Sequence, residues 1–253
     1  MDWFLSLPVF LQALLASLFT YGMTALGGTV VFFAAKLPKR FLTLMTGCAA
    51  GIMIAASFFS LLLPALEYDT PLPSWAVVSF GFCLGGLFIA FSDIFLEKIQ
   101  GKTASSGALL VFSVTLHNIP EGMAIGVAFG AAAGLTEGVA SALSLAIGIG
   151  LQNFPEGMCV AFPLRAAGSS SKKSFLVAQF SGFVEIVACL FGVIFVLFCT
   201  ALLPWVLAFS AGAMVAVVCS ELIPTCFSEN KLLSSVSVVL GFTLMMLLDT
   251  ALG

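Results

Sequence analysis

The sequence contains very little charge. Asp, Glu, Lys and Arg together account for 8% of its 253 residues, whereas 61% of the residues are hydrophobic. A soluble globular domain carries about 25% charged residues. This chain has too few polar side chains to cover an apolar core in water, so its composition excludes a soluble protein. We therefore predict an integral membrane protein whose surroundings are the lipid bilayer.

Several chemical signatures are also absent. The chain has one histidine, no HExxH or CxxC motif, no nucleotide-binding loop and no basic patch. Its seven cysteines all lie inside apolar runs, where they indicate packing rather than a disulfide framework or a structural zinc site. We therefore expect no ATP-driven transport, no nucleic-acid partner and no permanently bound cofactor.

Long apolar stretches divide the chain into units that can each cross a bilayer as a helix of about 20 residues. Charged residues, prolines and Gly-Ser clusters separate the stretches, and the connecting loops are short. This pattern predicts an all-α, polytopic membrane protein with eight transmembrane helices in a single domain, 1–253. The predicted spans are 9–35, 41–66, 75–96, 107–131, 138–163, 174–202, 205–227 and 232–252.

Positive charge is sorted completely between the predicted loops. All nine Lys and Arg residues follow odd-numbered spans, and none follows an even-numbered span. Because basic loops are retained on the cytoplasmic side during insertion, both termini should be extracytoplasmic. We expect a multi-pass protein of the cell membrane, whether plasma or inner membrane. The basic residues are Lys36, Lys39, Arg40, Lys98, Lys102, Arg165, Lys172, Lys173 and Lys231.

Two internal similarities predict an inverted repeat. "AGIMIAASFFSLLLP" (Ala50–Pro64) in the second span resembles "AGAMVAVVCSELIP" (Ala211–Pro224) in the seventh. The octet "LHNIPEGM" (Leu116–Met123) in the fourth span returns almost unchanged as "LQNFPEGM" (Leu151–Met158) in the fifth. The two members of each pair run in opposite directions through the membrane, an organisation common among transporters.

Each octet places two polar side chains four residues apart, and therefore on one face of a helix. These pairs are His117 with Glu121 and Gln152 with Glu156, and Asn118 and Asn153 lie beside them. The proline in each octet leaves a backbone carbonyl without its helical donor. Inside a membrane that carbonyl must find another partner, which can be a protein group, a water molecule or an ion. The glycine after each glutamate, Gly122 or Gly157, allows another backbone to approach closely.

The carboxylates inside the spans have no basic partner there. No Lys or Arg lies within a predicted span, whereas Glu121, Glu156, Glu185 and Glu221 do. An unpaired carboxylate in hydrocarbon costs about 2.5–3.5 kcal/mol on insertion scales, so these groups are either protonated or visited by a cation. Imidazole, carboxylate and amide groups together suit Zn²⁺, Fe²⁺ or Mn²⁺ rather than Cu⁺. The pattern favours a pathway for divalent metal ions.

Two alternative functions stay open on the residues alone. An intramembrane metalloenzyme would need three zinc ligands and an open position, and the single histidine argues against it. A carrier of organic cations or protons could use the glutamates as relays, but it would not need a polar pair on two helices. Glu185 and Glu221 could each be a protonated acid that is hydrogen-bonded across helices.

At these residues the chain resembles the ZIP family of divalent metal transporters, in its compact prokaryotic form. "HNIPEG", "QNFPEG" and "SGFVE" are similar to the family motifs of the fourth, fifth and sixth spans, and the resemblance covers the whole chain. It implies a secondary or facilitated transporter, not an enzyme, with spans in a 3+2+3 arrangement. Its substrate would be Zn²⁺ foremost, or Fe²⁺, Mn²⁺ or Cd²⁺, moved into the cytoplasm. A homodimer stays open.

The resemblance also implies a binuclear metal site. The first ion would be held by His117, Glu121, Gln152 and Glu156, and the second by Asn118, Glu121, Asn153, Glu156 and Glu185. Glu121 and Glu156 would bridge the two ions. The chain departs from the family pattern twice. Many members have histidine where Gln152 stands, so the first site should bind Zn²⁺ more weakly, and some have aspartate where Asn153 stands, so the second site has one charge fewer.

Overall fold

The computed structural model of the chain describes residues 2–34, 36–68, 70–100, 106–132 and 136–252. All of the regular secondary structure within these ranges is helical, which confirms the all-α prediction. The elements are α1 Asp2–Leu5, α2 Val9–Thr29, η1 Val30–Phe32, α3 Lys39–Ala56, η2 Ser57–Leu62, α4 Leu63–Glu67, α5 Ser74–Gln100, α6 Ser106–Ala131, α7 Thr136–Ala166, α8 Ser171–Phe198, η4 Thr200–Leu202, α9 Leu203–Val217, η5 Val218–Leu222, α10 Ile223–Glu229 and α11 Lys231–Leu252.

Six helical segments among the described residues are long and apolar enough to cross a membrane, which confirms a multi-pass protein. They coincide with six of the predicted spans. The other two predicted spans fall on α6 and α7, helices of 26 and 31 residues that carry the octets. The six segments are Val9–Phe32, Lys39–Glu67, Ser74–Ser92, Ser171–Phe198, Leu203–Glu229 and Lys231–Ala251.

The second and seventh spans are not uniform α-helices. Each widens into a π-helical segment, η2 or η5, directly before a proline near the start of the next α-helix, Pro64 or Pro224. A proline deprives the carbonyl four residues earlier of its donor, and a wider turn lets carbonyls reach amides further along the chain. The two π-helical segments occupy matching positions in the repeated sequences, so the internal similarity extends to backbone geometry.

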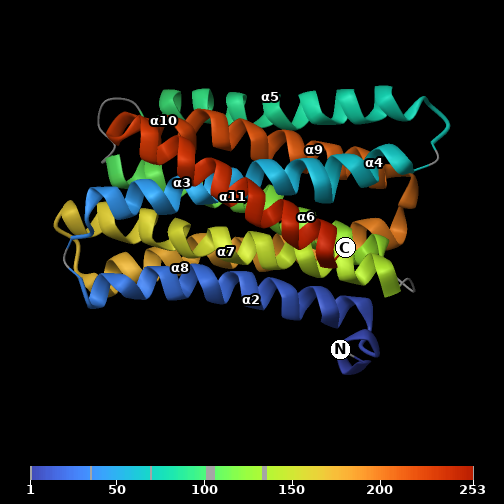
Figure 1. The fold of residues 1–253 in the computed structure, drawn as a ribbon, viewed down its shortest axis with the longest axis horizontal. Helices are drawn as coiled ribbons and strands as arrows, with labels where there is room; N and C mark the ends of the chain where they lie inside the picture. The colour runs from blue at the N-terminus through green and yellow to red at the C-terminus, as the bar shows by residue number, and fades with distance from the viewer. Residues whose placement is uncertain (1, 35, 69, 101–105, 133–135, 253) are drawn as a thin grey trace.

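The helices pack as two groups (Figure 1). We call α2, α6, α7 and α8 the motif bundle, because α6 and α7 carry the octets. The flanking bundle consists of α3, α5, α11 and the α9–α10 span. The packing has a twofold pattern: α6 lies on α8 as α7 lies on α2, and α5 lies on α9 as α11 lies on α3. The pattern relates α6 to α7 and α3 to α9, and these are the helices that carry the two internal sequence similarities.

Glycines set the closest helix contacts within each bundle. In the motif bundle, a Cβ on Gly126 would lie 2.0 Å from the Cys189 carbonyl oxygen. In the flanking bundle, a Cβ on Gly51 would lie 2.0 Å from the Val238 carbonyl oxygen. Between the bundles, Gly148 faces the side chains of Met245 and Ile52 rather than backbone atoms. Among the glycines whose surroundings the structure describes, backbone-to-backbone contacts of this kind therefore tie helices together inside a bundle rather than across the boundary.

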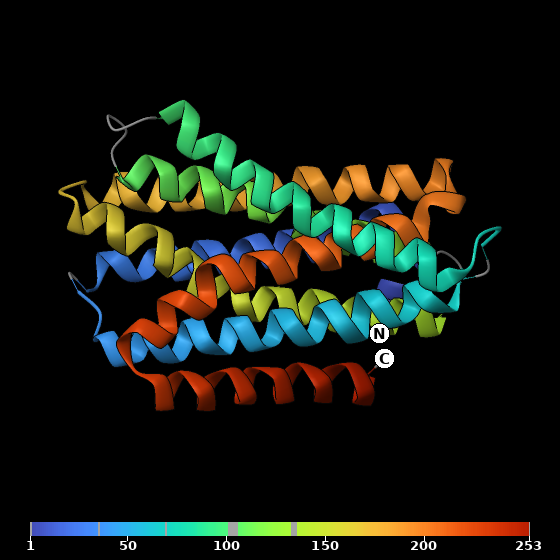
Figure 2. The same ribbon diagram turned by 90° about the horizontal axis from the view of Figure 1, so that it is seen from above.

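The start of α2 and the end of α11 lie at the same end of the molecule (Figures 1 and 2). We call this the terminal end. The opposite end, where α7 finishes and α3 and α8 begin, carries Lys39, Arg165 and Lys172, and we call it the basic end. Of the nine basic residues used in the prediction of charge sorting, Lys102 lies outside the described residues.

Candidate metal centre

Each octet uses one face to hold a neighbouring helix of the motif bundle. On α6, Asn118 Nδ2 donates a hydrogen bond of 2.9 Å to the Ser181 carbonyl oxygen on α8. One turn further on, a Cβ on Gly122 would lie 2.2 Å from the Glu185 carbonyl oxygen. The missing side chain at Gly122 is therefore what allows α6 and α8 to meet at this distance.

The second octet repeats this arrangement on another helix. Asn153 Nδ2 donates to the Thr20 carbonyl oxygen on α2 at 3.4 Å, and a Cβ on Gly157 would lie 2.1 Å from the Thr24 carbonyl oxygen. In each octet, the asparagine contact and the glycine contact lie four residues apart on the octet helix and four residues apart on its neighbour. The predicted close approach at the two octet glycines is confirmed. The asparagines also hold the helices together, a role that the sequence did not reveal.

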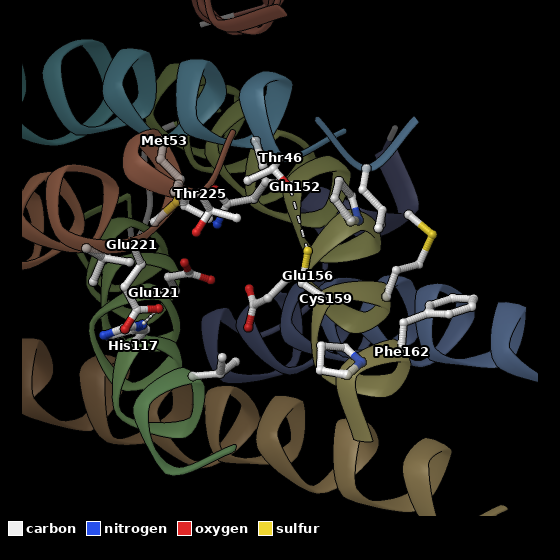
Figure 3. A pocket seen from close by; sticks show the side chains of 18 residues that line it. Thr46, Met53, His117, Glu121, Gln152, Glu156, Cys159, Phe162, Glu221 and Thr225 are labelled. Carbon is white, nitrogen blue, oxygen red and sulfur yellow. Dashed lines mark hydrogen bonds and ion pairs between the residues drawn. The ribbon is translucent and has the colours of Figure 1, made fainter. Parts of the chain in front are cut away.

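The other face of each octet lines a cavity of about 280 Å³ between the two bundles (Figure 3). The octets contribute the four residues predicted to bind the first ion: His117, Glu121, Gln152 and Glu156. The flanking bundle contributes the facing wall: Thr46, Met53, Glu221 and Thr225. His117, Glu121 and Gln152 are each at most 5% exposed, so the cavity places buried polar groups around a space large enough for an ion and water.

Glu185 and Asn153 lie behind this wall. Glu185 is fully buried, and its two carboxylate oxygens accept hydrogen bonds from Asn153 Nδ2 at 3.1 and 2.8 Å. Within the described part of the chain, neither residue lines the cavity, and neither does Asn118. The predicted ligands thus separate into a cavity group of four and a buried group formed by Asn118, Asn153 and Glu185.

Negative charge is concentrated around the cavity. Glu121 interacts electrostatically with Glu185, and Glu156 interacts with Glu121 and Glu221. Among the described residues, no Lys or Arg forms an ion pair with Glu121, Glu156 or Glu185. A closer partner of Glu221 is His117, whose Nδ1 lies 3.6 Å from Glu221 Oε2. Carboxylates that are gathered without a fixed cation attract a mobile one.

Buried polar atoms without hydrogen-bond partners also collect here. Within the ranges described, they include Asn118 Oδ1, Glu121 Oε2, Asn153 Oδ1, Glu156 Oε1 and both polar atoms of the Gln152 amide. Each such atom costs about 1–3 kcal/mol if nothing satisfies it. No three His, Cys, Asp or Glu side chains of these ranges already lie at metal-shell distances. An ion would therefore have to draw these side chains together.

Comparison with known proteins decides the family. The family described as "ZIP Zinc transporter" matches residues 99–249, a stretch that includes both octets and Glu185. The chain belongs to the ZIP family. The zinc transporter ZIP11 of Homo sapiens is 34% identical to it over 96% of this chain and 97% of that protein. The zinc transporter GufA of Myxococcus xanthus is 36% identical over 95% of this chain and 98% of that protein.

A third relative is the zinc transporter ZIPB of Bordetella bronchiseptica, which is 36% identical over 92% of this chain and 79% of its own length. These relatives are transporters rather than enzymes, and the family membership confirms the resemblance seen in the octets. In this ZIP protein the cavity group therefore belongs to a transporter of divalent metal ions.

The sequence predicted Glu221 as an intramembrane carboxylate of the metal pathway but not as a ligand of the binuclear site, and it did not single out Thr46 or Cys159. Glu221 lies in the π-helical segment η5, and all three residues line the cavity. For Glu221 the signal was the carboxylate itself, because an ionisable side chain close to a helix-breaking proline, Pro224, is unusual inside an apolar span. Thr46 and Cys159 give no such signal, since either residue can pack in a membrane helix.

The cavity extends in one direction only. Thr46 lies two turns from the start of α3, and Phe162 lies close to the end of α7, so these lining residues approach the basic end. Towards the terminal end, Ile125 follows Glu121 by one turn and Ile149 precedes Gln152 by one turn. Both isoleucines are at most 1% exposed and belong to the main apolar core of the molecule. Among the described residues, these packed side chains thus separate the cavity from the terminal end.

Proposed function

We propose that the chain is a secondary or facilitated carrier that moves divalent transition-metal ions into the cytoplasm, with Zn²⁺ as the foremost substrate and Fe²⁺, Mn²⁺ and Cd²⁺ as others. The observation that carries this proposal is the set of buried, unpartnered oxygen and nitrogen atoms on paired octets, next to carboxylates that lack Lys or Arg partners. A dication would provide a partner for the unpartnered polar atoms and neutralise the carboxylates at the same time. The names of the relatives favour the same substrate.

The first ion binds to His117, Glu121, Gln152 and Glu156, which already face the cavity. The second ion binds behind it, next to the unpartnered side-chain carbonyl oxygens of Asn118 and Asn153 and to the Glu185 carboxylate, which accepts hydrogen bonds from Asn153 in this structure. Glu121 and Glu156 bridge the two positions. Binding of the second ion displaces the Asn153 amide from Glu185, so this ion binds more weakly than the first.

The chain crosses the membrane eight times as one domain, in a 3+2+3 arrangement with an inverted repeat and both termini extracytoplasmic. The twofold packing and the paired π-helical segments support the repeat. With this orientation the cavity opens to the cytoplasm. Glycine contacts between backbones make each bundle stiff, whereas none of the described glycines makes such a contact across the boundary, so transport occurs when one bundle slides against the other.

A metalloenzyme or a proton carrier fits the site less well. A metalloenzyme needs an ion that stays in place with an open position for substrate, whereas the wide spacing of these side chains favours an ion that leaves. A carrier of protons alone has no use for the unpartnered amide oxygens of the two asparagines. The protein needs no permanent cofactor and resides in the plasma or inner membrane as a single chain or a homodimer.

The decisive experiment measures uptake of Zn²⁺ into proteoliposomes together with metal stoichiometry. Glu121→Ala and Glu156→Ala should each abolish uptake, because a site left with one carboxylate cannot offset dehydration of a dication in a low-dielectric setting. Glu185→Ala should retain partial uptake and bind one ion fewer. The control is Glu67→Ala, which removes an exposed carboxylate at the terminal end and should transport normally. Normal uptake by Glu121→Ala would eliminate the proposed mechanism.

A further inference from the structure

The α7 helix presents a third chemical group to the cavity beyond its two octet ligands. Gln152, Glu156 and Cys159 follow one another at spacings of four and three residues, so they share one helical face. All three line the cavity (Figure 3). Because α7 runs towards the basic end, Cys159 lies one turn closer to that end than Glu156 does.

The surroundings of Cys159 are suited to a metal ligand. Its Sγ lies 3.7 Å from the hydroxyl oxygen of Thr46 on α3, across the boundary between the bundles. Met53 and Met158 also line the cavity, so three lining residues carry sulfur. Sulfur donors are soft and polarizable, unlike the carboxylate and amide groups next to them.

The cavity wall at this level contains polar groups that need a partner. Gln152 is 2% exposed and neither polar atom of its amide is hydrogen-bonded; Glu121 is 1% exposed and its Oε2 is also unpartnered. Among the described residues, buried isoleucines separate these groups from the terminal end, so an ion held by them leaves along the cavity towards the basic end. Such an ion passes the Cys159 thiol on its way.

We infer that Cys159 and Glu156 form a transit site for thiophilic divalent ions on the cytoplasmic side of the metal centre, with the Thr46 hydroxyl as a supporting donor. This inference rests on the proposed function. When the ion binds, the thiol releases its proton to water in the cavity, and the resulting thiolate and the Glu156 carboxylate neutralise the dication. The site would favour Cd²⁺ and Zn²⁺ over Mn²⁺, because thiolate sulfur prefers softer ions.

A spectroscopic titration tests this inference without relying on transport. Cd²⁺ added to the purified protein should produce the ultraviolet charge-transfer absorption of a cadmium–thiolate bond. Cys159→Ser should remove this absorption, whereas the control Cys83→Ser, which replaces an exposed thiol on α5, should keep it. Persistence of the full signal in Cys159→Ser would overturn the inference.

Uptake measurements separate this inference from the proposed function. In proteoliposomes, Cys159→Ser should weaken the competition of Cd²⁺ against Mn²⁺ by about tenfold or more, the scale for losing a supporting metal partner. Retained Mn²⁺ uptake would show that the variant is folded. If the parent protein transports metal without a thiolate signal, the transit site is wrong and the carrier stands. If the parent neither binds nor transports metal, both proposals fail.

Discussion

The contact between Gly157 and α2 supports a quantitative prediction for the variant Gly157→Ala. The new Cβ would lie 2.1 Å from the Thr24 carbonyl oxygen, whereas ordinary contact begins near 3.4 Å. The helices α2 and α7 must therefore separate by about 1.3 Å, the difference between these two distances. Such overpacking costs about 1–3 kcal/mol. The better helix propensity of alanine returns about 1 kcal/mol.

The matched control is Gly22→Ala on α2, where a Cβ would have no neighbour within 4 Å. This variant receives the helix-propensity gain without the clash, so it should be slightly more stable than the parent. Thermal unfolding in detergent should place Gly157→Ala below Gly22→Ala by about 1–3 kcal/mol, the overpacking range. Gly157→Ala should also slow Zn²⁺ uptake, because the neighbouring Glu156 moves with the helix. Equal stability and normal uptake would show that the helices are not in backbone contact.

Two further predictions concern the substrate and the orientation. Gln152→His adds a nitrogen ligand to the cavity group, so isothermal titration should show tighter Zn²⁺ binding and uptake assays should show slower release; unchanged affinity would remove Gln152 from the ligand set. For the orientation, a cysteine at Glu67 should react with an impermeant reagent added outside intact cells, and one at Ser170 only after permeabilisation. Labelling of Ser170 from outside would reverse the proposed direction of transport.

The repetition of the octet has a structural reason as well as a chemical one. Each copy fastens its own helix to a neighbour through the asparagine and the glycine, and each presents its pair of predicted ligands to the cavity on the other face. The motif therefore combines a helix–helix contact with a pair of polar side chains that face the cavity. Two copies running in opposite directions bring two carboxylates, Glu121 and Glu156, to one cavity without a soluble scaffold.

The sequence alone determined the membrane class, the positions of most spans and the four residues that now face the cavity. These features depend on short-range chemistry. Scarce charge excludes a soluble core, an apolar run of sufficient length makes a spanning helix, and a spacing of four places two side chains on one face. Placing a carboxylate in two apolar helices costs enough insertion free energy to indicate a function, even when the packing is unknown.

The tertiary structure alone decided how the helices are turned towards one another. In a membrane protein, lipid and protein interior are equally apolar, so a helix carries little amphipathic signal for the face that packs. The sequence therefore could not show that Asn153 holds Glu185 behind the cavity. Nor could it show that the π-helical segment η5 brings Glu221 beside His117, or that Cys159 lines the cavity. These placements depend on contacts between helices far apart in the chain.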